Sequence, residues 1–289
     1  MKRVSMERFA VLVLLSVYLV LSVSAFGQTA ADRIDLYFGD WHTAHARIAH
    51  GTLEERDILT RGDGLNPTQK GAVLRYINTY AYATLAPHTS TKTERLQDQQ
   101  EIYFVQSGSG TVRGGGQSID LRRNIAVLVP AGLEFQIENT SAQPLEMYVI
   151  NEPTVAGFRP NSSILARDEN QLPISSSNGM WAHIVKKLFV TADGLSTLEA
   201  VLTVTLDPLT IGKPHPVPGE DSNEIEEVWT ALEGKSLAMV GNQLRWQTPG
   251  IAYLHIPDNQ SPHTNVNDSQ DSQVRFLYFA RYREHELRK

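Results

Sequence analysis

The sequence predicts an all-β protein made of two similar domains, and two observations lead to this expectation. From Tyr76 onward, apolar and polar residues alternate in short runs that end at Gly, Pro or Asn, for example over 101–108, 125–132 and 145–153. Short alternating runs at close intervals are typical of antiparallel sandwiches and barrels. The same landmarks also occur twice in the same order, roughly 127 residues apart, which indicates an internal repeat.

Three pairs of landmarks define this repeat. Pro87-His88 matches Pro214-His215, the spacing from Glu101 to Gly108 matches that from Glu227 to Gly234, and Pro130–Asn139 matches Pro257–Asn267. One coincidence of this kind would mean little, but three in order indicate a duplicated domain. The stretch 156–180, rich in Pro, Asn and Ser, is therefore expected to connect the two copies.

Composition limits the class of protein. The chain has 289 residues, of which 20% are charged, and a net charge of -6. This length suits two domains that each bury a core. We find no basic stripe interleaved with aromatic residues, so no nucleic-acid partner is expected. With no cysteine, disulfides and thiolate metal sites are excluded.

Residues 1–27 are predicted to be a signal peptide. Lys2 and Arg3 precede the apolar run 9–26, and small residues around Ala25 provide a cleavage zone. A single membrane anchor is the alternative, because the run approaches the length needed to span a bilayer. With cleavage, the protein is expected to be secreted or periplasmic, with no membrane contact.

An N-terminal arm is expected over residues 28–75. Within it, His42 and His45 have helical spacing and would share one helix face, whereas His50 would point elsewhere. The pair lacks a third ligand on that face. We therefore expect a short surface helix that ends at Gly51, rather than a metal-binding helix.

The second copy of the repeat contains candidate metal ligands. Two imidazoles and one carboxylate, from His215, Glu227 and His263, make an open divalent-metal site if separate strands bring them together. Mn, Fe, Ni and Zn all suit this donor set. Strand alternation places Trp229 on the same side as Glu227, either in a pocket or simply in the core. Asn267, four positions after His263, is assigned to the same pocket.

At these residues the chain resembles the cupin superfamily. The spacings Glu101–Gly108 and Glu227–Gly234 fit the second part of the first cupin motif, and PAGLEFQIEN and PDNQSPHTNVN fit the second motif. The resemblance implies a bicupin with two tandem jelly-roll barrels and an N-terminal arm, barrel 1 over 76–155 and barrel 2 over 181–289. The chain is similar to a secreted, largely uncharacterised bacterial group of cupin-domain proteins. The resemblance also implies a possible homodimer, because homodimers are frequent in the superfamily.

The first copy departs from the cupin pattern. Cupin metals are usually held by three histidines and one glutamate that face the barrel lumen. Here His88 and Glu101 remain, but Phe135 stands where the third ligand belongs. A phenyl ring cannot coordinate a metal. The first site is therefore interpreted as degenerate and metal-free, a structural barrel or an apolar pocket.

The second copy departs less from the cupin pattern. It lacks the second histidine of the first motif, and Val217 stands in that place. The acidic loop that follows offers Glu220 as a replacement ligand, while its other carboxylates, including Glu226, are expected to be solvated. Arg275 and Arg281 on the last strand are also expected in solvent, and the glycine-rich segment 113–116 is interpreted as a hairpin rather than a phosphate cradle.

The resemblance implies two classes of function. One is an exported metal-dependent enzyme that acts on a small polar molecule, of hydrolase, isomerase or dioxygenase type. A ureidoglycine aminohydrolase-like bicupin and a quercetinase-like dioxygenase are concrete versions of it. The other is a non-catalytic bicupin that binds a small molecule or has a structural role. Catalytic residues are not assigned, because fold does not determine function.

Overall fold

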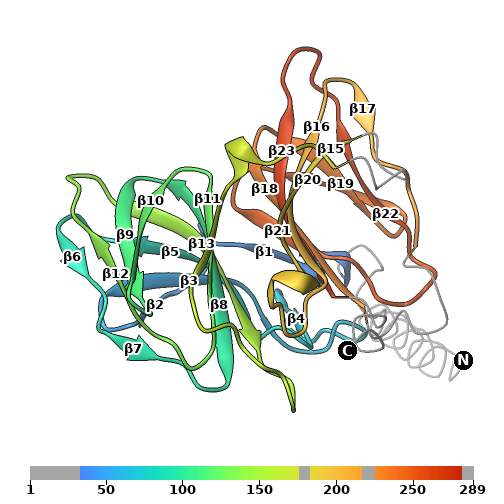
Figure 1. Cartoon of the computed structure of the whole chain (residues 1–289). Coiled ribbons are helices and arrows are strands. Elements are labelled where there is room, and N and C mark those ends of the chain that lie inside the picture. Colours follow the sequence, from blue (N-terminus) through green and yellow to red (C-terminus); the bar gives the residue numbers. More distant parts are fainter. Residues whose placement is uncertain (1–32, 176–182, 217–224, 282–289) are drawn as a thin grey trace, which may run out of the picture. The chain divides into compact units, whose positions relative to one another are not determined.

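The structure, a computed structural model, describes residues 33–175, 183–216 and 225–281. The chain divides into two compact units, 1–35 and 36–289, and the second unit contains both barrels. Apart from residues 33–34, which are helical, the elements of the described residues are strands and short 3-10 helices, so the predicted all-β fold with two jelly-roll barrels is confirmed (Figure 1). No helix among these residues is long and apolar enough to cross a membrane. The predicted signal peptide, 1–27, lies outside the described residues.

Barrel 1 consists of an eight-stranded sheet that faces a five-stranded sheet. The larger sheet has the order β14 (Leu165–Asp168), β11 (Ile125–Val129), β8 (Gln99–Ser107), β13 (Leu145–Pro153), β5 (Thr79–Leu85), β3 (Leu53–Arg61) and β2 (Ala46–Ala49), with β4 (Ala72–Leu74) beside β3. The smaller sheet has the order β10 (Gln117–Arg122), β9 (Ser109–Gly114), β12 (Glu134–Asn139) and β6 (Thr89–Ser90), with β7 (Glu94–Arg95) beside β12. Alternate residues of both sheets, among them Val105, Phe135 and Val149, point inward and form one apolar core.

Barrel 2 repeats this arrangement with a six-stranded and a four-stranded sheet. The larger sheet has the order β1 (Phe38–Asp40), β21 (Ile251–Leu254), β18 (Glu226–Glu233), β23 (Val274–Arg281), β16 (Ala200–Leu206) and β15 (His183–Val190). The smaller sheet has the order β17 (Thr210–Ile211), β22 (His263–Asn267), β19 (Ser236–Val240) and β20 (Gln243–Gln247). The described part of the chain also contains three 3-10 helices: η1 (Asp35–Tyr37), η2 (Glu169–Gln171) and η3 (Thr191–Asp193).

The segment expected to be an arm contributes strands to both barrels. β1 pairs with β21 of barrel 2, whereas β3 pairs with β5 of barrel 1. The helix expected near His42 is wrong, because residues 46–49 pair with 53–56 as a β-hairpin. At its turn, His50 and Gly51 have φ values of 47° and 82°. In the other direction, β14 lies in the expected linker and pairs with β11 of barrel 1.

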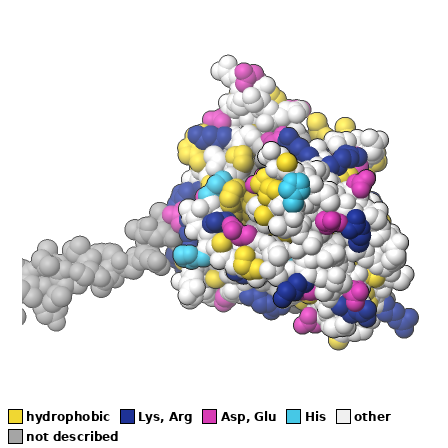
Figure 2. Space-filling model, turned by 90° about the vertical axis from the view of Figure 1, so that its left-hand side faces the viewer, with side chains coloured by type: hydrophobic (Ala, Val, Ile, Leu, Met, Phe, Trp, Pro, Cys, Tyr) yellow, Lys and Arg dark blue, Asp and Glu magenta, His cyan; other side chains and the backbone are white. Residues whose placement is uncertain are grey.

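The glycine-rich segment 113–116 is confirmed as a hairpin. β9 and β10 pair with Gly114 opposite Gln117, and Gly115 and Gly116 between them have φ values of 58° and 76°. Two consecutive residues with positive φ form the turn that suits the twist of a two-residue hairpin, and glycine adopts them without steric cost. Figure 2 shows basic and acidic side chains interspersed on one face of the molecule, with no extended basic patch there.

A pair of buried glutamates joins the two barrels. The carboxylate of Glu152, in β13, accepts hydrogen bonds from the backbone N–H groups of Thr197 and Leu198, just before β16. In the reverse direction, the carboxylate of Glu226, in β18, accepts from the backbone N–H groups of residues 75–77, just before β5. The expectation that Glu226 is solvated is therefore wrong, since the residue is 2% exposed.

Candidate functional site

The structure brings the three predicted ligands of barrel 2 together. His215 and His263 form an isolated β-bridge, with backbone N–O distances of 3.0 and 3.3 Å, and their ring centroids lie 4.7 Å apart. The Nε2 atom of His263, in β22, is 3.4 Å from Oε1 of Glu227, in β18. β22 of one sheet and β18 of the other thus place His263 and Glu227 side by side inside the barrel, and the half-buried His215 lies next to His263.

A fourth residue, His255, belongs to this cluster and was not among the predicted ligands. Its ring centroid lies 4.2 Å from that of His263, and its backbone N–H donates to the carbonyl oxygen of Glu227. The sequence did carry a signal for it. Tyr253, two residues earlier, faces His263 with a centroid distance of 6.4 Å, and period-two alternation puts His255 on the same side.

Backbone carbonyl groups orient two of the imidazoles. Nδ1 of His215 lies 2.7 Å from the carbonyl oxygen of Lys213, and Nε2 of His255 lies 3.1 Å from that of Ser261. A carbonyl oxygen only accepts, so these ring nitrogens carry the hydrogen. In the neutral imidazole, the other ring nitrogen then keeps its lone pair, which is the usual arrangement of a metal-binding histidine.

His263 is the most unusual member of the cluster. It is 1% exposed, and neither of its ring nitrogens has a hydrogen-bond partner among the described residues. Buried polar atoms without a partner are uncommon and need a physical explanation. A ligand that accepts or shares the lone pair of His263 would supply the missing partner.

Burial keeps His255 and His263 neutral. It lowers the pKa of His263 to about 3, with a further contribution from His215, and it lowers the pKa of His255 to about 3, with a further contribution from His263. Since the folded-state values lie below the ordinary value of 6.5, the associated stability is present above pH 6.5 and lost as the pH falls toward 3. Both imidazoles are therefore unprotonated at neutral pH, as metal ligands must be.

Trp229 and Asn267, the two predicted pocket residues, have clear structural partners. The indole Nε1 of Trp229 donates to Oε1 of Glu227 at 2.7 Å, so the two side chains share one side of β18 as strand alternation requires. The amide nitrogen of Asn267 donates to three backbone carbonyl oxygens at 2.8–3.1 Å. Asn139, its counterpart in barrel 1, closes the corresponding turn in the same way.

The donor set of barrel 2 fits a divalent metal chemically, because it combines three imidazoles with one carboxylate and leaves His263 unpartnered. As the side chains stand, however, no group of three or more His, Asp or Glu among the described residues is arranged to hold a metal ion. Val217 and Glu220, where the sequence raised the question of a replacement ligand, lie outside the described residues.

Barrel 1 contains a charged cluster at the corresponding place. Glu101 is the counterpart of Glu227, and the hydroxyl of Tyr103, two residues on, donates to it as Trp229 does in barrel 2. The β2–β3 turn contributes His50, whose Nε2 lies 3.2 Å from Oε1 of Glu101. Sequence reasoning missed His50, because no local pattern relates it to a strand 50 residues away.

His50 bridges two carboxylates. Its Nδ1 lies 2.8 Å from Oε2 of Glu94, opposite the contact with Glu101. Burial tends to lower the pKa of His50, but Glu101 and Glu94 outweigh burial and raise it to about 9. Phe135 is buried, with its ring centroid 5.7 Å from that of His50, while His88 is exposed at the surface. An imidazolium, rather than an apolar pocket, thus lies beside Glu101.

Comparisons with known proteins agree with this fold. Residues 81–151 match the family model of the cupin domain. No curated protein sequence matches the chain.

Solved structures cover most of the chain at low identity. A putative glyoxylate-induced protein from Pseudomonas aeruginosa superposes with a TM-score of 0.63 at 15% identity, over 81% of this chain and 83% of that one. Vicilin from hazelnut, Corylus avellana, gives 0.60 at 12% identity, over 85% of both chains. A mutant of oxalate decarboxylase from Bacillus subtilis gives 0.60 at 13% identity, over 84% and 76%. These similarities show the fold, and they include both an enzyme and vicilin.

Proposed function

We propose that this chain, a bicupin of the cupin superfamily, binds a divalent metal ion inside barrel 2 and acts there on a small polar molecule. The observation that carries the proposal is His263, which is buried beside Glu227 and His255 and whose ring nitrogens have no hydrogen-bond partner among the described residues. A metal ion is the ligand that three imidazoles and one carboxylate recognise best.

His263, Glu227, His255 and His215 would hold the metal. The bound ion would supply Lewis-acid polarisation of a carbonyl or carboxylate group, or an activated water. The protein prepares the donors: the indole N–H of Trp229 fixes one oxygen of Glu227, and backbone carbonyl groups fix the tautomers of His215 and His255. Mn, Fe, Ni and Zn all remain compatible with this set.

A non-catalytic binding role is the second candidate, and one observation favours it. Trp229 is buried against Tyr278 and Phe276, with centroid distances of 4.8 and 5.7 Å, and it occupies the interior beside Glu227. A bulky ring at that place leaves less room for a substrate. It restricts any ligand of the metal to a small molecule.

Metal content tests the proposal. Purified protein saturated with Mn, Fe, Ni or Zn and then freed of excess ion is expected to retain about one equivalent, measured by elemental analysis. His263→Ala is expected to retain less than about a tenth of an equivalent, because it removes the central imidazole. His45→Ala, at an exposed position, is the control and should bind like the unmodified protein. Less than a tenth of an equivalent in the unmodified protein, or equal retention by His263→Ala, would contradict metal binding.

We further propose that the protein is exported and that residues 1–27 are its leader. The support is the basic flank, the apolar run 9–26 and the small residues around Ala25. Expression of the whole chain in a bacterium should give periplasmic or external protein, with a new N-terminus that mass spectrometry places just after Ala25 or Gly27. Ala25→Arg should leave the leader attached. An intact leader on the unmodified protein in the membrane fraction would instead indicate an anchor.

A further inference from the structure

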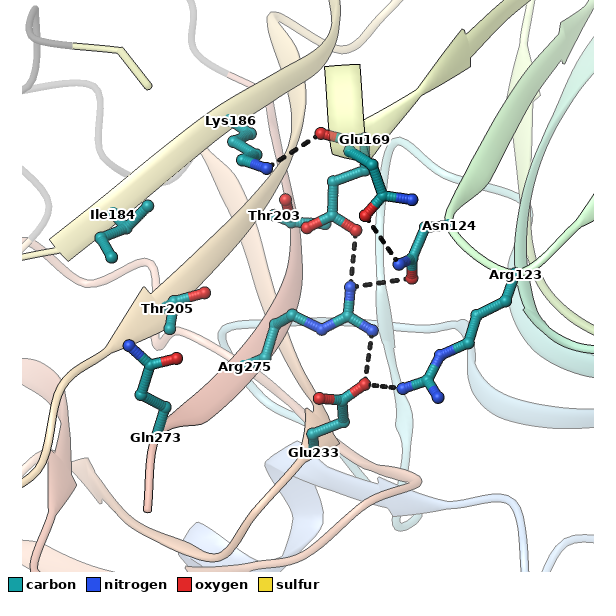
Figure 3. Close-up of a pocket in the computed structure, with 11 residues that line it drawn as sticks. Arg123, Asn124, Glu169, Ile184, Lys186, Thr203, Thr205, Glu233, Gln273 and Arg275 are labelled. Atoms are coloured by element: carbon teal, nitrogen blue, oxygen red, sulfur yellow. Dashed lines mark hydrogen bonds and ion pairs between the residues drawn. The ribbon is translucent and has the colours of Figure 1, made fainter. Parts of the chain in front are cut away.

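A polar pocket of about 360 Å³ lies between the two barrels, away from the metal-ligand cluster. The outer faces of β15, β16 and β23 form one side of it, and Arg123, Asn124 and η2 of barrel 1 form the other (Figure 3). Its volume is at the lower end of the range for small-molecule sites. Such sites frequently lie where two domains meet.

The side chain of Arg275 lines this pocket. It was expected in solvent, but its side chain is only 12% exposed. Nη1 donates to Glu169 at 2.5 Å and to Asn124 at 3.0 Å, and Nη2 donates to Glu233 at 2.7 Å (Figure 3). The buried Nε atom has no hydrogen-bond partner among the described residues. The side chain of Arg275 is therefore held in position without a ligand.

The two carboxylates of the pocket are already paired. Glu169 contacts Arg275, and Glu233 contacts both Arg275 and Arg123. Burial tends to raise the pKa of Glu233, but the two arginines outweigh it and hold the pKa below its usual value. Arg275 and Arg123 are thus both paired with an ionised carboxylate.

Lys186 has binding capacity left. Its ammonium group donates to the carbonyl oxygen of Glu169 at 3.0 Å, and an ammonium group has three N–H donors. Thr203 and Thr205, on the neighbouring strand, line the same pocket (Figure 3). Three cationic side chains line it against two carboxylates, so it has one unit of excess positive charge in a chain whose net charge is -6.

From this arrangement we propose that the pocket binds a small monocarboxylate, whose carboxylate accepts from Lys186 and Thr205 and whose polar substituent faces Arg275. A carboxylate and a phosphate share the oxyanion chemistry that these donors recognise. The single unit of excess charge favours a monoanion, because a dianion would lie close to Glu169 and Glu233 without compensation. The ligand would contact both barrels and would be independent of metal in barrel 2.

Glycolate is a suitable probe, with inorganic phosphate and neutral glycolamide as comparators. In methyl-labelled protein, the Thr203 and Thr205 signals are expected to shift saturably with glycolate, with a Kd on the order of 1 mM. Glycolate should also raise the unfolding temperature, because it binds only the folded protein. Lys186→Gln should weaken binding at least tenfold, whereas Lys187→Gln, the same charge change outside the pocket lining, should not.

Thr205→Val provides a second variant that leaves the bond from Lys186 to Glu169 in place, and it should also weaken glycolate binding. The absence of a saturable shift would overturn the inference. So would equal binding of glycolamide, tighter binding of phosphate, or equal weakening by Lys186→Gln and Lys187→Gln. The metal content of barrel 2 is measured separately, so failure here does not bear on the metal proposal.

Discussion

Replacing Glu226 with alanine is expected to lower the free energy of unfolding by about 3–5 kcal/mol. The carboxylate accepts three backbone N–H groups, from residues 75–77, and it is 2% exposed at the contact between the barrels. Alanine removes the acceptor and leaves one buried and two part-buried N–H donors without it, and each unsatisfied buried group costs about 1–3 kcal/mol. Urea denaturation followed by tryptophan fluorescence measures the change.

Three other variants calibrate this result. Glu226→Gln keeps one acceptor oxygen and should lose less stability than alanine. Glu134→Ala removes a 61% exposed carboxylate whose ion pair with Arg95 spans 3.7 Å, and it should cost less than about 1 kcal/mol. Glu152→Ala should behave like Glu226→Ala, because Glu152 accepts from Thr197 and Leu198 in the same way. If Glu226→Ala and Glu134→Ala lower the free energy of unfolding by the same amount, Glu226 does not hold the barrels together.

Replacing His50 with alanine is expected to cost about 3–5 kcal/mol at pH 6. The change removes the cation between Glu101 and Glu94 and leaves Glu101, which is 2% exposed, without its cationic partner. Part of the loss depends on Glu94, which is 34% exposed and is rehydrated more easily. The urea midpoint at pH 6 measures the loss, with His45→Ala as an exposed control.

The same contact predicts how stability depends on pH. The pKa of His50 rises from 6.5 to about 9 in the folded protein, so its stabilising contribution is full below pH 6.5 and is lost as the pH rises through 9. The difference in unfolding free energy between the unmodified protein and His50→Gln should therefore shrink between pH 6.5 and 9.5. A difference that stays constant over this range would show that His50 is not an imidazolium.

Much of the candidate site followed from spacing. Glu101 and Glu227 begin equivalent alternating runs, and alternation alone placed Trp229 beside Glu227. The same rule, extended past Tyr253, places His255 on the side of the strand that faces His263. The position of a residue within a strand is a local property, because the side-chain direction repeats every two residues.

Other features depended on contacts between distant segments. No local pattern indicates that the β2–β3 turn brings His50 to Glu101, or that the segment around Arg275 meets Glu169 and Glu233. Glu226 is adjacent to an acidic loop, and its neighbours in the sequence favoured a solvent-exposed side chain. Its burial follows from the packing of barrel 2 against residues 75–77 of barrel 1.

The sequence by itself determined that the chain is a duplicated all-β protein and which strand carries each glutamate, because alternation and repeated spacing are written in neighbouring residues. Only the tertiary structure decided that β1 completes barrel 2 while β14 completes barrel 1, and that barrel 1 holds an imidazolium where barrel 2 holds neutral imidazoles. The physical reason is that burial and charge at a site depend on which distant segments pack there. Phe135 and His263 occupy equivalent positions of the repeat. The segments that pack around each position decide whether the nearby imidazole is charged, as His50 is in barrel 1, or neutral, as His263 is in barrel 2.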